Sequence, residues 1–502
     1  MKNIFTFVIP QQIVWRFNSD IKGNGLIWRL IFMRISKIFS GFFLAVVAGF
    51  LLLGTSGCRD DGFDTNPDLS LSFSKDSLLF DTVFTTVGSA TRSFKVYNHH
   101  NRRIRLSSVS LAGGTDSYFR INVDGASGTI LRDVEIEARD SIFVFVEVTL
   151  DPVNQSLPLI VTDSVVFSLN GRMQDVKLVA WGQDANFIYP NTVTPDGLQY
   201  HLISQDAVWD DALPWVIYGL AVAGQGVNLR VTEGARVHFH NNASLIFLSG
   251  ASLKVEGTAE MPVSFQGDRP EALYRELPGQ WGRIWLSATS RDHDINHAII
   301  KNGTVGLHVD TIGSTSGPTL RIRNTQIRNM TLVGLLAQGS WVDAENLLIA
   351  NCGEHAMILA LGGRYAFRHT TLANFFSLIN HPIRRTPSLV LNNYFIDENN
   401  NVQYRPFEQL YFANSIIYGS VNEEVFFNFL EGSQDEYLFD HCLLRTENNV
   451  FTPSFPGVIL NQNPLFNDSR FNDYRLTENS PAIGAGNPDV SAQVPVDLAG
   501  NP

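Results

Sequence analysis

The segment Val227–Thr258, which reads VNLRVTEGARVHFHNNASLIFLSGASLKVEGT, decides the fold. Apolar and polar residues alternate in very short runs, and corners that contain glycine, such as Glu233-Gly234-Ala235, close these runs. Short strands with frequent corners are typical of a solenoid, in which each rung pairs only with its neighbours. The segment therefore predicts a right-handed parallel β-helix.

A repeat of the form apolar-x-Asn supports the same fold. It ends at Asn302, Asn329, Asn351 and Asn374, with separations of 27, 22 and 23 residues. Asn tolerates the left-handed backbone that a corner requires, and stacked amides can hydrogen-bond along a solenoid. We therefore expect these four residues at equivalent corners of one ladder, in a helix of about ten rungs of 20–30 residues.

Short strands of another kind precede the β-helix, from Leu69 to about Asp184. Period-two runs such as Phe143–Val148 are separated by turn residues such as Asn170-Gly171. Several such strands within one region predict a β-sandwich.

The N-terminal region is interpreted as a targeting signal. Met33 opens a second possible start, the apolar run Ile38–Leu53 follows, and the small residues Ser56-Gly57 directly precede Cys58. This is the order of a secretory signal. The alternative is a transmembrane anchor, because about 20 apolar residues span a bilayer.

Three resemblances to known families refine these expectations. Ser56-Gly57-Cys58 resembles a bacterial lipobox, which implies that Cys58 carries a lipid and becomes the mature N-terminus. Arg59-Asp60-Asp61 resembles the acidic signal of Bacteroidetes surface lipoproteins, which implies lipid anchoring at the outer membrane, facing the cell surface. The order Val96-Tyr97-Asn98, Tyr118–Ile121, Thr149–Pro152 and Ala180-Trp181-Gly182 resembles immunoglobulin-like domains of the ASPM–SPD-2–Hydin type, which imply a spacer or interaction surface.

The β-helix resembles the pectate-lyase-like superfamily. Gly279–Leu286 is similar to its W-G-x-I rung, and Asn414–Gly419, Asn463–Phe466 and Asn479–Gly486 are similar to its later rungs. The superfamily contains lyases, hydrolases and adhesins, so the fold alone selects no function. The predicted class is all-β, in this order: signal region 1–57, tether 58–68, immunoglobulin-like sandwich 69–184, β-helix 186–485 and C-terminal tail 486–502.

Composition excludes several classes of protein. The chain has 502 residues, of which 44% are hydrophobic and 17% charged, which is typical of a globular chain and not of a disordered one. Without residues 1–57, which hold six basic residues and one acid, its net charge changes from −12 to −17. A surface of this sign repels nucleic acid.

The sequence shows no catalytic set. The acidic candidates are Asp292 and Asp294 around His293, with Asp310 nearby, and the pair Asp343 and Glu345. Neither pair recurs one rung later with a basic partner at a matching position. We therefore expect no calcium-dependent lyase site, no metal and no cofactor. Cys352 and Cys442 belong to distant rungs, so we interpret both as core residues rather than as a disulfide or a nucleophile.

The candidate ligand site is aromatic. Trp281, Arg283 and Trp285 are expected on the outer face of one strand, with Ile284 and Leu286 pointing inward. An outward Trp beside a cation suits a sugar that carries a carboxylate, and the insertion at residues 380–413 would close over it. The alternative is that both rings are buried beneath this insertion.

The leading hypothesis is therefore a lipid-anchored envelope protein that binds a glycan or an envelope partner without catalysis. The alternatives are a polysaccharide-active enzyme, either a lyase or a glycoside hydrolase, and a structural envelope component.

Overall fold

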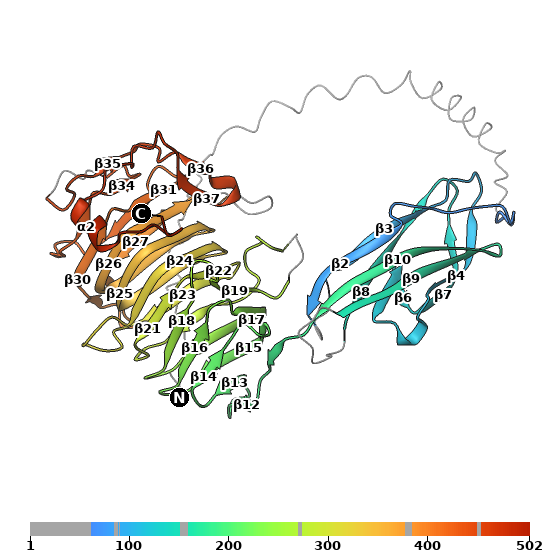
Figure 1. Cartoon of the computed structure of the whole chain (residues 1–502), viewed down its shortest axis with the longest axis horizontal. Helices are drawn as coiled ribbons and strands as arrows, with labels where there is room; N and C mark the ends of the chain where they lie inside the picture. The colour runs from blue at the N-terminus through green and yellow to red at the C-terminus, as the bar shows by residue number, and fades with distance from the viewer. Residues whose placement is uncertain are drawn as a thin grey trace, which may run out of the picture. The chain divides into compact units, whose positions relative to one another are not determined.

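The computed structural model describes residues 62–84, 89, 91–150, 159–269, 274–376, 384–448 and 453–501. These residues form an all-β chain, as predicted, with one short α-helix, α2 (Pro488–Gln493), in the described ranges (Figure 1). Cys58 and residues 380–383 lie outside the described residues, so the predictions made for them remain predictions.

The first body is a β-sandwich of two five-stranded sheets, ordered β1-β3-β8-β5-β6 and β2-β10-β9-β4-β7. One face of each sheet is apolar: along β8, Val144, Val146 and Val148 are fully buried and the residues between them are exposed. The strands are β1 (Ser72–Phe73), β2 (Ser77–Phe84), β3 (Arg92–Tyr97), β4 (Ile104–Leu111), β5 (Phe119–Val123), β6 (Ala126–Gly128), β7 (Ile130–Ile136), β8 (Ser141–Val148), β9 (Leu159–Leu169) and β10 (Arg172–Gln183).

The second body is a parallel β-helix whose strands form three ladders. Ladder A contains β11 (Asn186–Ile188), β15 (Trp215–Ala223), β17 (Arg236–Phe247), β19 (Val263–Gly267), β22 (Ala298–Lys301), β24 (Leu320–Met330), β25 (Val333–Cys352), β26 (His355–Asn374), β31 (Ile416–Gly419), β34 (Leu443–Leu444) and β35 (Ile459–Leu460).

The long strands turn corners and so belong to more than one ladder. Ladder B adds β13 (Gln199–Ile203), β20 (Ile284–Leu286), β23 (Val305–Asp310), β27 (Leu389–Asn392) and β32 (Val425–Asn428) to parts of β15, β17, β25 and β26. Ladder C adds β14 (Ala207–Trp209), β16 (Asn228–Thr232), β18 (Ser252–Glu256), β21 (His293–Asn296), β30 (Phe407–Ala413) and β33 (Leu438–Asp440) to parts of β24, β25 and β26.

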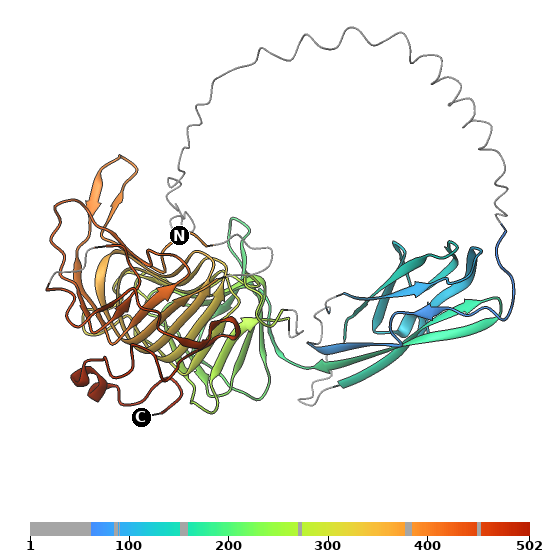
Figure 2. The ribbon, with the colours of Figure 1, turned by 90° about the horizontal axis from the view of Figure 1, so that it is seen from above.

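Two antiparallel hairpins interrupt or follow the rungs. The first, β28 (Tyr394–Ile396) with β29 (Val402–Tyr404), projects from the β-helix (Figure 2). The second, β36 (Phe466–Asp468) with β37 (Asp473–Leu476), follows the last rung. A further short strand, β12 (Thr192–Val193), pairs with β13.

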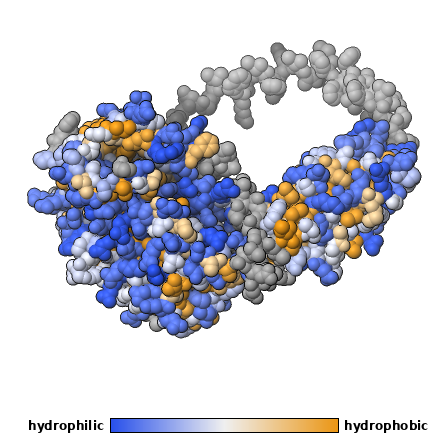
Figure 3. Space-filling model, in the orientation of Figure 1, coloured by the Kyte–Doolittle hydropathy of each residue, from blue (hydrophilic) through white to orange (hydrophobic). Residues whose placement is uncertain are grey.

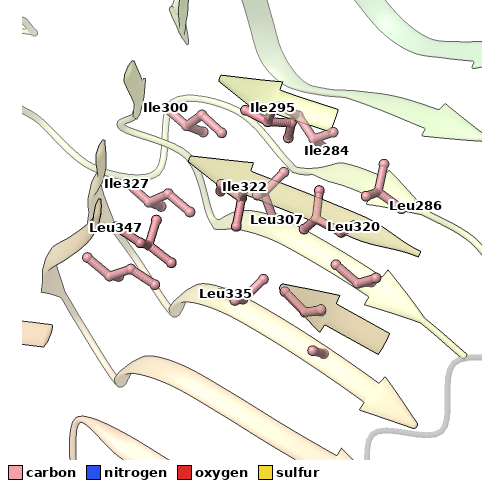
Figure 4. Packing of buried hydrophobic residues seen from close by; sticks show 14 of the residues in the cluster. Ile284, Leu286, Ile295, Ile300, Leu307, Leu320, Ile322, Ile327, Leu335 and Leu347 are labelled. Carbon is pink, nitrogen blue, oxygen red and sulfur yellow. The ribbon is translucent and has the colours of Figure 1, made fainter. Parts of the chain in front are cut away.

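Apolar side chains from successive rungs stack to form the core of the β-helix. Ile284 is in register with Leu307, and Leu307 with Leu335, and all three are fully buried (Figure 4). Such contacts recur at every rung, because parallel register places equivalent residues directly above one another. The core is therefore filled by side chains, and only the outer faces and corners can receive a ligand.

Two ladders of polar residues occupy the corners. The four predicted Asn residues lie in register in ladder A, and Asn302, Asn329 and Asn351 adopt φ of 69°, 56° and 52°. The predicted register is confirmed, and the left-handed backbone is found at these three residues but not at Asn374. A second ladder, which was not predicted, lies at the corner between ladders C and A. All its members adopt φ of 48–51°. They are His297, Asn324, Asn346, His369, Asn414 and His441.

The C-terminal segment covers this second corner ladder. The side-chain amide of Asn346 donates to the carbonyl oxygen of Val496 at 2.8 Å, and that of Asn414 donates to the carbonyl oxygen of Asn487 at 3.0 Å. Tyr474 packs in a small cluster against Leu348 on the outside of ladder A. Residues 474–496 therefore protect one corner and one flank of the solenoid.

Candidate functional site

Trp281 does not lie on the outer face, which corrects the predicted site. Its indole is fully buried, stacks on Phe239 with centroids 4.2 Å apart, and donates from Nε1 to the carbonyl oxygen of Lys301 at 2.8 Å. Strand β20 begins only at Ile284, so strand alternation does not extend back to Trp281. At Gly282 a Cβ atom would lie 2.1 Å from the hydroxyl of Ser244, so the chain there packs too closely for a side chain.

Arg283 and Trp285 do lie outside the core, on ladder B, and Ile284 and Leu286 point inward as predicted. The Trp285 indole is half-buried, stacks parallel to His308 and donates to Asp310 Oδ2 at 2.7 Å. Burial lowers the pKa of Arg283, and the charge of Asp310 opposes that shift. Both residues are thus members of a packed polar cluster rather than an open platform.

Arg384, a basic residue of the insertion that was expected to close over the Trp281 site, is not available to a ligand. Its guanidinium is fully buried and pairs with the fully buried Glu424, at 2.6 Å between Nη2 and Oε1. Ser388 and Val421 donate backbone N–H groups to the same carboxylate, each at 2.9 Å. The pair ties consecutive rungs of ladder B together and has no access to a ligand.

The candidate nucleophile and the candidate histidine are also structural. Burial raises the pKa of the Cys352 thiol to about 12, and that of Cys442 likewise to about 12. His293 points into the core, where burial lowers its pKa to about 3 and its Nδ1 accepts from the backbone N–H of Leu253. Neither type of group can act as a nucleophile or base at a surface.

Neither carboxylate pair recurs one rung later, but Asp294, Asp343 and Glu345 have basic partners on neighbouring rungs that the sequence did not reveal. Asp294 pairs with Arg323 of the next rung at 2.8 Å. Arg368 reaches back one rung and contacts Asp343 at 2.8 Å and Glu345 at 3.3 Å, both from Nη2. All five side chains lie on the outer face of ladder C, because the residues that alternate with them are buried.

The short side chain of Ala366 also lies on this face. Parallel register places Asp343 on one side of Ala366 along the axis and Tyr411 on the other. Arg364 and Arg368 flank it on its own strand, because alternate residues share a face. We name this arrangement the Ala366 site: a methyl group whose neighbours on the face are a carboxylate, a phenol ring and two guanidinium groups.

Neighbouring side chains hold these walls in place. Arg364 pairs with Glu408 and lies over the ring of Trp341, 5.1 Å from its centroid. The Tyr411 hydroxyl lies 3.4 Å from Asp440 Oδ2, and burial raises the pKa of Tyr411, so the phenol keeps its proton at neutral pH. The Ala366 site therefore combines an aromatic ring with hydrogen-bond donors and acceptors of fixed position.

A cleft of about 170 Å³ lies on the same face toward the N-terminal rungs. It is lined by Lys254, Val255, Glu256, Gly257, Asp294, Asn296 and Arg323. Arg323 is in register with Glu345, and Glu345 contacts Arg368 of the Ala366 site, so the two features are neighbours on one face. We call this second feature the Asn296 cleft.

Other kinds of site are not found within the ranges that the structure describes. Those ranges hold no cluster of three His, Cys, Asp or Glu side chains placed to bind a metal. In the same ranges, no helix has the length and apolar character needed to cross a bilayer. A larger hollow, of about 430 Å³, is lined by residues that include Gly226, Gly250 and Arg291. The side of the molecule drawn in Figure 3 is mostly hydrophilic, with separate apolar patches.

Comparison with known proteins assigns no family. No protein-family model and no curated protein matches the chain. Among solved structures, the catalytic domain of a GH87 α-1,3-glucanase in complex with nigerose is 12% identical, with 75% of this chain and 92% of that chain covered and a TM-score of 0.18.

Two further structures match shorter parts of the chain. A family 123 glycoside hydrolase from Clostridium perfringens is 7% identical and has a TM-score of 0.19. The match covers 28% of this chain and 30% of that hydrolase. The ASH/PapD-like domain of human CEP192 is 12% identical, with 26% of this chain and 95% of that domain covered and a TM-score of 0.16. At these TM-scores the similarities carry no inference about activity.

Proposed function

We propose that this chain is a lipid-anchored envelope protein that binds a glycan on the outer face of ladder C without cleaving it. The observation that carries the proposal is the Ala366 site. A sugar ring offers an apolar C–H face and several hydroxyl groups, each of which both donates and accepts. Tyr411 supplies an aromatic surface for the first, and Asp343 with Arg368 supplies an acceptor and donors for the second.

The rigidity of the solenoid supports this reading of the site. The walls come from consecutive parallel strands whose inward neighbours, such as Tyr365 and Phe367, are fully buried. Side chains held by packing and by ion pairs lose little conformational entropy when a ligand binds. A preorganised face of this kind suits the recognition of a polymer that itself offers few apolar contacts.

The ion pairs of the carboxylates support the proposal of binding without cleavage. Asp343 accepts a hydrogen bond from Arg368, and Glu345 forms an ion pair with the same guanidinium group. A glycosidase needs one carboxyl group that donates its proton to the leaving oxygen, and a carboxylate that already accepts from a guanidinium is poorly placed for this step. Binding without turnover is therefore the function that the contacts favour.

One observation favours a polysaccharide-active enzyme as the second candidate. Because Asp343 Oδ1 and Glu345 Oε1 contact the same nitrogen at 2.8 and 3.3 Å, these oxygens lie no more than about 6 Å apart. The paired carboxyl groups of retaining glycosidases are about 5–5.5 Å apart. Release of new reducing ends from a bound polysaccharide would support this candidate instead.

The anchor is a separate part of the proposal and rests on the sequence. Ser56-Gly57-Cys58 ends an apolar run, and a lipid on Cys58 would hold the sandwich and the β-helix at the envelope. The sandwich then acts as a spacer. The partners proposed are accordingly a membrane, through the lipid, and a polysaccharide or envelope protein, through ladder C.

The test is retention of the mature chain on immobilised polysaccharides, with assay of the eluate for reducing ends. Ala366→Leu places a larger side chain between Asp343 and Tyr411 and is expected to weaken retention at least tenfold. Ala360→Leu is the matched control, because Ala360 lies on the same strand in ladder B, in register with Gln338. Equal retention of both variants, with both folded by circular dichroism, would contradict the proposed site.

A further inference from the structure

The outer face of ladder C carries cations and anions that neutralise one another. Its ion pairs run from the N-terminal to the C-terminal rungs: Arg230–Glu256 at 2.7 Å, Asp294–Arg323 at 2.8 Å, Arg368–Asp343 at 2.8 Å, and Arg364–Glu408. Pairs between successive rungs place both signs of charge within contact distance along the whole face. The face thus has strong local polarity and little net charge.

This pattern selects against a charged polymer. A polyanion is held by a run of cations, but here each of these four guanidinium groups lies against a carboxylate that repels the polymer, and the whole chain is acidic, at −12. A neutral hydroxyl group avoids that repulsion, because it donates to the carboxylate and accepts from the guanidinium at the same time. The sugar with a carboxylate, expected from Trp281 and Arg283, is therefore not the ligand that this face fits.

The Asn296 cleft and the Ala366 site lie on one line along the solenoid axis. The cleft is formed by β18, β21 and β24, and the Ala366 site by β25, β26 and β30, which are the next strands of the same ladder. Adjacent strands are about 4.8 Å apart, so the five steps from β18 to β30 span about 24 Å. This length exceeds one sugar unit several times over.

We propose that the ligand is a neutral linear polysaccharide that lies parallel to the solenoid axis and occupies the Asn296 cleft and the Ala366 site together. This inference rests on the proposed function and adds the class of ligand, its direction and a second subsite. In the cleft, Lys254 and Asn296 supply donors and acceptors beside the Asp294–Arg323 pair. The two subsites are expected to contribute separately to affinity, because no single residue lines both.

The experiment is isothermal titration of the mature chain with purified linear glucan, mannan and xylan oligosaccharides, from disaccharide to octasaccharide. Oligogalacturonates of the same lengths serve as the anionic comparison. For one neutral series, affinity is expected to increase with length until both subsites are filled, and then to stay constant. The anionic series is expected to bind at least tenfold more weakly at equal length.

Variants separate the two subsites. Lys254→Ala, and independently Asn296→Ala, should weaken binding of the longer oligosaccharides about tenfold, the equivalent of one lost hydrogen-bonding group at about 1.4 kcal/mol, and leave the short ones unchanged. Ala366→Leu should weaken all lengths. Two variants of the cleft are used because Asn296 also accepts a hydrogen bond from Asn324 at 2.9 Å, whereas Lys254 is a surface residue of β18.

The outcomes distinguish this inference from the proposed function. Affinity that is independent of length but lost in Ala366→Leu overturns the second subsite and leaves glycan binding in place. Tighter binding of the oligogalacturonates overturns the neutral class. Absence of binding to every series overturns both the inference and the proposed function.

Discussion

Replacement of Trp281 by alanine is expected to destabilise the β-helix strongly, because this indole is part of its core. The side chain is fully buried, stacks on Phe239 and donates to the carbonyl oxygen of Lys301. Truncation of a large buried aromatic residue costs about 3–5 kcal/mol. Loss of the hydrogen bond at the buried Lys301 adds about 1 kcal/mol. Trp281→Ala should therefore lower the free energy of unfolding by roughly 4–6 kcal/mol.

The matched control is Trp341→Ala. Trp341 is half-buried on the outer face of ladder C, where Arg364 covers one side of the ring. Removal of a side chain at such a position changes stability by about 1 kcal/mol or less. The comparison therefore isolates burial from the chemistry of the indole.

The assay is urea unfolding followed by far-ultraviolet circular dichroism, which does not depend on the number of tryptophans. The shift of the midpoint multiplied by the slope gives the change in the free energy of unfolding. Similar shifts for the two variants would refute the assignment of Trp281 to the core. The same result would instead support the outward placement of Trp281 at a ligand site, as the sequence predicted.

Three other predictions concern charge, pH and anchoring. Glu424→Gln leaves the buried guanidinium of Arg384 without its charged partner and should lower the free energy of unfolding by about 3–5 kcal/mol in the same assay. Glu408→Gln removes the charge of an exposed pair and should change the free energy of unfolding by about 1 kcal/mol or less. Equal effects of the two variants would count against the buried pair. Burial lowers the pKa of His293 from 6.5 to about 3, so only the unfolded state takes up a proton between these pH values. The free energy of unfolding should therefore fall as the pH drops from about 6.5 toward 3, by up to about 1.4 kcal/mol per pH unit, and should fall less steeply in His293→Gln. An unchanged slope in His293→Gln would exclude a contribution of His293 to acid destabilisation. Cys58→Ala should move the protein out of the detergent phase or leave an unprocessed precursor; unchanged mass and partitioning would exclude the anchor.

The fold could be predicted from the sequence because its determinants are local. The alternation in β20 correctly places Ile284 and Leu286 in the core, and the Asn repeat gives the register of one corner ladder. The second corner ladder was missed because His and Asn share its positions. Its spacing is also irregular: the long insertion between His369 and Asn414 hides the repeat.

The site could not be predicted because it depends on register between rungs. Asp294 and Arg323 are 29 residues apart in sequence and one rung apart in space, and rungs of unequal length conceal such pairs. The placement of Trp281 failed for a different reason. Alternation was extended through Gly282, where the chain packs against Ser244 and is not part of the strand. A glycine within a short apolar run is the signal that argued against one continuous strand.

The most direct test of the central claim is a crystal structure of the mature chain with the longest neutral oligosaccharide that it retains. We predict sugar density on the outer face of ladder C, with one ring over Ala366 against Tyr411 and the chain continuing past Arg323 toward Asn296. Density on ladder B beside Trp285, or on the sandwich, with ladder C bare, would contradict the account.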